Sequence, residues 1–220
     1  MEAQTIMRQA PGGTTAERIL ASGMACFARE GFAGATTRMI AAEAGVTLPV
    51  IAYHFGNKDG LHRACAQEIV EQHRRGLLPL TSAAREAASG PLAPEAAREW
   101  LEKILSALVA MITADTGQRL STDFVLREMS EQGPGYALLF EELWQPGIGL
   151  VADLVAIARK REPGNEDDRA GALMLIASLS AFTREEPISR AFLGWDALDD
   201  DRRGKVAGIA HRLLAGLVAE

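Results

Sequence analysis

The chain has 220 residues, of which 48% are hydrophobic, 24% charged and 5% aromatic. This length allows one large domain or two modest ones with a buried core, and the composition is typical of a soluble globular protein. No apolar run approaches 18 residues, so no membrane span is expected. Residues 1–13 lack an apolar core followed by a small-residue cleavage site, so no secretion signal is expected. Because Cys26 and Cys65 are too few for a disulfide framework, we expect a cytoplasmic protein.

The net charge of −6 is distributed unevenly along the chain. Residues 1–75 carry 8 lysines and arginines against 7 aspartates and glutamates, a net charge of +1. Residues 76–220 carry 15 against 22, a net charge of −7. A polyanion can therefore approach only the first third without strong repulsion, which permits nucleic-acid binding there without establishing it.

The first part of the chain is predicted to be a flexible tail followed by four helices. The tail covers residues 1–13 and ends in Pro-Gly-Gly. The first helix is expected from Thr14 or Thr15 to Gly31, and two short helices follow at 37–44 and 48–55. A fourth helix is expected from Asn57, which caps it, to about residue 78.

The remaining chain is also predicted to be helical, because alanine and leucine dominate and strand patterns are weak. Segment 79–94 holds three prolines and many small residues, which predicts a break between two parts. Helices are then expected from Pro94 to about Met111, from 119 to 132 and from 136 to 161, with Pro146 kinking or splitting the last. Two strongly apolar helices, at 167–182 and 205–219, complete the chain.

The stretch from Thr36 to Lys58 has the spacing of a helix-turn-helix unit, in which Gly45 allows a left-handed turn. Hydroxyl and N–H groups at helix N-termini can bind phosphate, and Arg38 can reach a guanine edge. Spacing alone would equally fit a plain helical hairpin. The candidate DNA-binding residues are Thr36, Thr37, Arg38, Thr47, Leu48, Pro49, Val50, Tyr53, His54 and Lys58.

From about Thr14 to Cys65 the chain resembles the N-terminal domain of TetR-family transcriptional regulators. The resemblance rests on F-x-x-x-G-F at the end of the first helix, then T-T-x-x-I-A-x-x-A-G-V and Y-H-F-x-x-K. It implies that residues 36–38 face DNA, that 47–50 with 53 and 54 belong to the recognition helix, and that Lys58 binds phosphate. The chain departs from many members in carrying alanine at position 52 and its tyrosine one residue later.

The segments REMSEQGPGYALLFEELWQPGIGLVADLV and ISRAFLGW are similar to the CecR-like or YbiH-like subgroup of this family. That similarity implies an all-α chain with a three-helix DNA-binding domain at 14–62 and a larger effector-binding and dimerisation domain at 63–220. Aromatic and methionine side chains at helical spacing are more often plain core, and an arginine can equally be a surface charge. With those alternatives open, the candidate pocket residues are Trp100, Met111, Phe124, Arg127, Phe140 and Trp144. Candidate dimer residues are Leu173, Ile176, Ala177, Ser180, Ile209, Leu213, Gly216 and Leu217.

Neither the motifs of common hydrolases nor a nucleotide-binding glycine loop occurs, so we expect no enzyme, cofactor or metal site. The sequence instead predicts a ligand-responsive regulator, a repressor that binds a palindromic double-stranded operator as a homodimer. A small, partly apolar effector would release it, and no membrane is involved. Two alternatives remain open: a constitutive DNA-binding dimer without an effector, and an interaction protein that does not use its helix-turn-helix.

Overall fold

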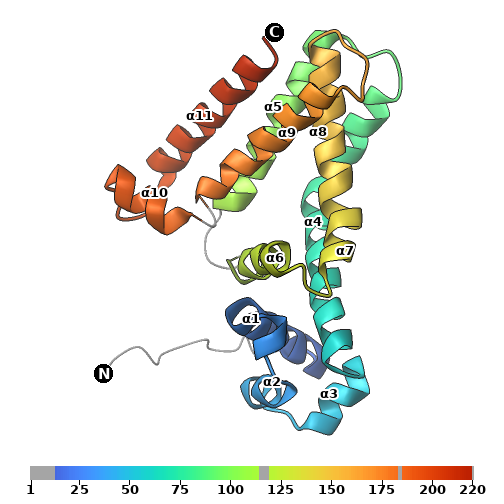
Figure 1. Cartoon of the computed structure of the whole chain (residues 1–220), viewed down its shortest axis with the longest axis vertical. Coiled ribbons are helices and arrows are strands. Elements are labelled where there is room, and N and C mark those ends of the chain that lie inside the picture. Colours follow the sequence, from blue (N-terminus) through green and yellow to red (C-terminus); the bar gives the residue numbers. More distant parts are fainter. Residues whose placement is uncertain (1–12, 114–118, 183–184, 220) are drawn as a thin grey trace.

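The computed structural model describes residues 13–113, 119–182 and 185–219, which form helices and no strand (Figure 1). Helices α1 (Thr15–Gly34), α2 (Thr37–Ala44) and α3 (Leu48–Phe55), with the first half of α4 (Lys58–Ala88), form a head at one end. The rest is the body, which the long α4 enters. Its elements are α5 (Pro94–Thr113), α6 (Arg119–Glu131), α7 (Tyr136–Leu139), the π-helix η2 (Phe140–Trp144), α8 (Gln145–Ala158), α9 (Glu166–Ser178), the 3₁₀-helix η3 (Leu179–Phe182), α10 (Glu186–Leu193) and α11 (Asp200–Leu217).

The helices of the head begin where the sequence predicts, because polar side chains cap them. The Thr14 hydroxyl accepts from the Glu17 N–H at 3.2 Å, and the Glu17 carboxylate accepts from the Thr14 N–H at 2.7 Å, which completes a capping box. Asn57 caps α4 by accepting from the Gly60 N–H at 2.8 Å. The predicted all-α fold is confirmed, whereas 12 residues of the predicted tail lie outside the described part.

Helix α4 corrects one prediction, since it continues through Pro79 to Ala88 instead of ending near residue 78. Proline removes one N–H donor from the helix, and the Ala-rich segment that follows favours helix strongly enough to compensate. The Thr81 hydroxyl also donates to the Leu77 carbonyl at 3.0 Å. The break between the two parts therefore shifts to residues 89–93.

Pro146 splits the helix that the sequence predicts from 136 to 161, as expected. The turn before it is the π-helix η2, and α8 starts with Pro146 in its first turn, where a missing N–H costs least. Helix α10 was not predicted, because its segment lies between two much more apolar helices. Asp199 caps α11 by accepting from the Arg202 N–H at 2.9 Å.

Two hydrophobic cores lie along α4. One belongs to the body and joins α4, α5, α8, α9 and α11. The other belongs to the head but includes Phe124 from α6 and Leu139 from α7. The predicted domain boundary after residue 62 falls inside α4, which contributes side chains to both cores. Among the described helices, none is both long and apolar enough to cross a membrane.

Candidate nucleic-acid interface

Helices α2 and α3 are joined by a tight turn whose geometry requires glycine. Gly45 adopts φ 64° and ψ 40°, a left-handed conformation that a β-carbon would strain. The next N–H, of Val46, donates to the Ala41 carbonyl at 3.0 Å, which closes the end of α2. Ile40 of α2 and Ile51 of α3 are buried on the inner side of the helix pair, so the opposite sides of the two helices face solvent.

Arg18 of α1 supports this turn from behind, a role that the sequence did not suggest. Its Nη2 atom donates to the Ala44 carbonyl, the last of α2, at 2.9 Å. A cation at a helix C-terminus also interacts favourably with the helix dipole. The two residues are 26 positions apart, and no local pattern announces such a contact.

The start of α2 presents one fixed hydroxyl and one free cation. Thr36 is the N-cap, and its hydroxyl accepts from the Met39 N–H at 3.2 Å. Thr37 is half-buried, and its hydroxyl group follows the cap directly. Arg38 is exposed and, among the residues the structure describes, has no ion-pair or hydrogen-bond partner. Its guanidinium is available to an incoming polyanion.

The start of α3 is apolar and accessible. Thr47 is its N-cap without a side-chain capping bond, so the hydroxyl is not committed to the helix. Leu48 and Pro49 are exposed in the first turn. Val50, by contrast, is half-buried and packs against the core of the head, so it offers a partner less surface than predicted.

Tyr53 and His54 project from the end of α3. Tyr53 is 85% exposed, and its ring meets the His54 ring edge-on with centroids 5.1 Å apart. An aromatic ring this exposed contributes little to the core of its own subunit. Both side chains carry polar groups that could reach phosphate.

Lys58 has a structural role in addition to the predicted one. Its Nζ atom donates to the Phe32 carbonyl at 2.8 Å and to the Ala35 carbonyl at 3.1 Å, and it lies 4.3 Å from the centroid of the Phe32 ring. Two of its three donors therefore hold the end of α1. A contact with phosphate would have to use the third.

Comparisons with known proteins agree with this geometry. Residues 19–65 match the model of the bacterial regulatory proteins of the tetR family, a segment that spans α1 to α4 through the helix-turn-helix. The chain is also 28% identical over 192 residues to the HTH-type transcriptional dual regulator CecR of Shigella flexneri, covering 87% of this chain and 85% of CecR.

Residues 19–65 therefore form a DNA-binding domain of the TetR type.

Three further matches concern one regulator and two solved structures. Over 61 residues, 28% of each chain, the protein is 39% identical to the HTH-type transcriptional regulatory protein RaaS of Mycobacterium tuberculosis. A TetR-like regulator from Rhodococcus sp. RHA1 shares the fold, with a TM-score of 0.66, 22% identity, and coverage of 96% of this chain and 100% of that one. FadR from Bacillus subtilis, solved in complex with stearoyl-CoA, has a TM-score of 0.55 at 16% identity, covering 92% and 97%. The protein is a DNA-binding transcriptional regulator.

Head and body meet at a seam between α1 and α6. The Arg127 guanidinium donates to the Ala28 carbonyl at 3.1 Å and the Arg29 carbonyl at 3.0 Å, and it pairs with Glu131 at 2.7 Å. These carbonyls lie just before Gly31, where α1 kinks with φ 72°. Arg127, predicted for an effector pocket, is occupied by these contacts.

A buried pair of ionisable side chains lies in the same seam. Nε2 of His62 in α4 is 3.0 Å from Oε1 of Glu128 in α6, and both side chains are at most 3% exposed. The Gly135 N–H donates to the other oxygen of Glu128 at 2.7 Å. The rings of Phe27 and Phe124 lie 4.6 and 4.8 Å from the imidazole, so Phe124, also predicted for the pocket, belongs to the seam.

The other predicted pocket residues are not gathered with these two. Trp100 is half-buried against the body core, whereas Trp144 packs against the head core. Phe140 is exposed and stacks on Tyr136 with centroids 6.1 Å apart, and Met111 is half-buried in α5. The pocket stays a prediction for these four.

Seven of the eight predicted dimer residues lie on helices α9 and α11 (Figure 1), whereas Ser180 lies in η3, directly after α9. Leu173, Ile209 and Leu213 are about half exposed, and Ala177 and Gly216 are exposed as well. The remaining three are half-buried: Ser180, Ile176 and Leu217, the last two against the body core. Dimerisation through them also stays a prediction.

Proposed function

We propose that the protein is a ligand-responsive repressor that binds an approximately palindromic operator as a homodimer in the cytoplasm. The observation that carries this proposal is the exposed set of hydroxyls, apolar side chains and an unpaired arginine around the Gly45 turn. Two such heads would enter successive major grooves, so the half-sites should lie about one helical turn apart. The proposed contact residues are Thr36, Thr37, Arg38, Thr47, Leu48, Pro49, Val50, Tyr53, His54 and Lys58.

The proposed contacts fall into two kinds. The helix starts at Thr36 and Thr47, with Tyr53, His54 and Lys58, would bind phosphate and fix the position of the head. Arg38 would read guanine, while Leu48 and Pro49 would contact thymine methyl groups. Because Arg38 is the forked donor at the start of α2, we expect it to carry much of the sequence preference.

The proposed division of labour places DNA binding in residues 14–62 and effector binding and dimerisation in residues 63–220. An effector in the body could reach the heads by two routes. The first is α4, whose 31 residues extend about 46 Å from the head into the body. The second is the seam, where Arg127 and Glu128 hold α6 against α1 and α4. Movement of α6 would displace its contacts with α1 and with α4 together.

Such a mechanism is allosteric only if the effector binds the two arrangements with different affinities. We propose a small, partly apolar effector, bound near Trp100, Met111, Phe140 and Trp144. Phe124 and Arg127 are engaged in the seam and are therefore not free to line an effector pocket. For this part of the predicted pocket, their contacts favour the alternative, a constitutive DNA-binding dimer.

Selection of bound duplexes from a random DNA library tests the DNA-binding proposal. We expect an enriched palindrome with half-site centres about 10 base pairs apart. A single unrepeated site would contradict binding as a two-headed dimer. Titrating the selected duplex with a panel of small molecules, including an acyl-CoA, then tests the effector, and unchanged affinity with every compound would support the constitutive alternative.

A further inference from the structure

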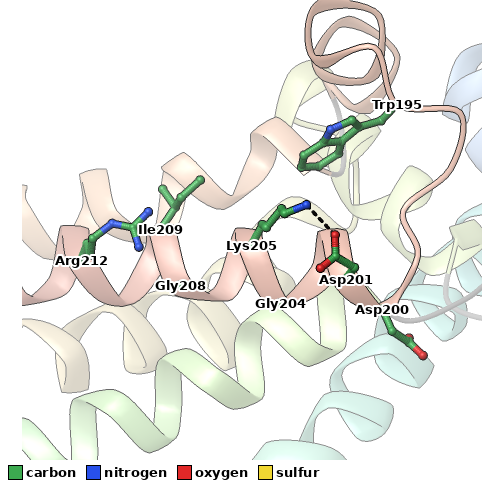
Figure 2. A pocket seen from close by; sticks show the side chains of 8 residues that line it. All are labelled: Trp195, Asp200, Asp201, Gly204, Lys205, Gly208, Ile209 and Arg212. Atoms are coloured by element: carbon green, nitrogen blue, oxygen red, sulfur yellow. Dashed lines mark hydrogen bonds and ion pairs between the residues drawn. The ribbon is translucent and has the colours of Figure 1, made fainter.

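Many ionic side chains of the body lie at its surface, where water can replace their partners. A groove of about 600 Å³ along α11 shows such a pair (Figure 2). There Lys205 donates to Asp201, and the two side chains are 59% and 75% exposed, so neither depends on the other for solvation. Glu128 of α6 differs, because its side chain is 3% exposed. A carboxylate buried this deeply is costly unless other groups of the protein stabilise it.

The loop between α6 and α7 is shaped around this carboxylate. A β-carbon on Gly133 would lie 2.4 Å from Oε1 of Glu128, and one on Gly135 would lie 3.0 Å from Oε2. Neither glycine has a positive φ, so the loop needs them for space and not for backbone freedom. Gln132, by contrast, adopts φ 48° at the start of the loop, which is unfavourable for a residue with a side chain. The loop thereby brings the Gly135 N–H to the carboxylate at 2.7 Å.

On its other side the carboxylate meets α4. Oε1 of Glu128 lies 3.0 Å from Nε2 of His62, whose side chain is 1% exposed. Within the described part of the chain, neither ring nitrogen of His62 has an aligned hydrogen-bond partner, so this contact is electrostatic and the Gly135 N–H supplies the directed bond. The rings of Phe27 and Phe32 lie 4.6 and 5.0 Å from the imidazole. Among such apolar neighbours an electrostatic contact is stronger than it would be in water.

Two consecutive residues of α6 therefore hold two different helices of the head. Arg127 donates to two carbonyls of α1, and Glu128 contacts His62 in the second turn of α4. A single attachment point would let the head pivot on the body, whereas two points on different helices fix its orientation. Helix α3 ends at Phe55, just before α4 begins, so the position of His62 determines that of the reading helix. Buried ionic contacts serve conformational specificity in some proteins, because their geometry is more restricted than that of apolar packing.

We propose that Glu128 is a positioning residue that fixes the distance between the two heads of the dimer, and with it the half-site spacing of the operator. The inference rests on the proposed dimeric repressor and adds a determinant of operator choice outside the DNA-contacting surface. Because the bodies pair in that dimer, the orientation of each head on its body sets the separation of the heads. Two heads bind one duplex tightly only if this separation matches the half-sites before binding.

Binding of the full chain to the selected operator and to duplexes with one base pair inserted or removed between the half-sites tests the proposal. One base pair moves a half-site by about 3.4 Å and turns it by about 35°. The wild type should lose affinity about tenfold or more on insertion, because the second head no longer engages fully. Glu128→Ala should bind the selected operator about tenfold more weakly but lose less than about threefold on insertion. Fluorescence anisotropy measures each dissociation constant.

Further variants separate positioning from stability. Glu128→Gln keeps the size of the side chain and an acceptor for the Gly135 N–H, so it should restore the wild-type spacing preference. Gly133→Ala would displace the carboxylate without removing a polar group, so it should relax that preference. Gly149→Ala is its matched control, since a β-carbon on this glycine of α8 would meet no atom within 4 Å.

Asp168→Ala is the control for loss of a buried carboxylate. Asp168 is paired with Arg159 at 2.7 Å inside the body, so its loss should lower the unfolding temperature and leave the spacing preference unchanged. The inference fails if folded Glu128→Ala keeps the wild-type preference, or if Asp168→Ala relaxes it equally. Where circular dichroism shows Glu128→Ala to be unfolded, Gly133→Ala decides by the same criterion. A wild-type protein that binds every spacing equally would overturn the proposed two-headed operator binding, and this inference with it.

Discussion

The surface of the head and the outer surface of α9–α11 are both exposed, but their chemistry differs. Around Gly45 the exposed groups are hydroxyls, ring edges and an unpaired arginine, as a polyanionic partner requires. On α9–α11 they are large apolar side chains around a groove, as an apolar partner requires. Because the two surfaces suit different partners, binding of one partner can be lost without loss of the other. Substitutions on one surface should leave the function of the other intact.

The largest effect is expected on the apolar surface, from Leu213→Asp. A carboxylate buried in an apolar contact should weaken the dimer by about 3 kcal/mol, roughly a hundredfold in dissociation constant. Leu78→Asp on α4 is the control, since Leu78 is 49% exposed and Leu213 is 50% exposed. Analytical ultracentrifugation measures both, and equal behaviour of the two variants would refute the proposed dimer face.

A smaller effect is expected on the head, from Arg38→Ala. Loss of the only unpaired forked donor at the start of α2 within the described head should reduce discrimination between operator and unrelated DNA by about 1–3 kcal/mol. Competition binding by fluorescence anisotropy measures this difference. Arg63→Ala, an exposed arginine on α4, should change the affinity for both DNAs equally. A shift in the monomer–dimer equilibrium of Arg38→Ala would break the separation between the surfaces.

Lys58 sharpens the comparison because it serves both the fold and the proposed contact. Lys58→Ala should weaken binding to all sequences and lower the salt slope by roughly one unit. It should also lower the free energy of unfolding by about 1 kcal/mol, since the carbonyls at the end of α1 lose their donor. Denaturant titration and binding at several salt concentrations separate the two effects. Lost stability with an unchanged salt slope would restrict Lys58 to its structural role.

The smallest effects concern one glycine from each surface. Gly45→Ala should lower the free energy of unfolding by about 1 kcal/mol, because φ is 64° there. Gly208→Ala should raise it by up to about 1 kcal/mol, because the backbone is helical and the site is open within the subunit. Denaturation at concentrations low enough for a monomer measures both. A decrease for both variants would show that the subunit itself requires glycine at position 208.

The elements of the head could be predicted from the sequence because their signals are local. Thr36 and Asn57 cap helices within three residues, and Gly45 ends α2 at the turn itself. The bounds of α2 and α3 are those predicted. Pro79 misled the prediction because the helix preference of the residues after it outweighed the loss of one N–H donor.

The seam could not be predicted, because its contacts join residues far apart in the chain. Arg127 and Ala28 are 99 positions apart, and neither residue type nor helical spacing indicates that a guanidinium reaches α1. Phe124 likewise was predicted for the pocket from its place in the sequence, whereas the fold packs it into the head core. Lys58 resembled a surface cation, and only the fold brings two carbonyls to it.

The presence of Phe124 and Leu139 in the head core has a practical consequence for protein engineering. A fragment excised after residue 62 would retain every proposed DNA contact yet expose the sides of Phe27 and His62 that the Phe124 ring contacts. Such a piece should be poorly folded when expressed alone. A chimera that grafts these DNA contacts onto another regulator would have to carry α6 and α7 with them.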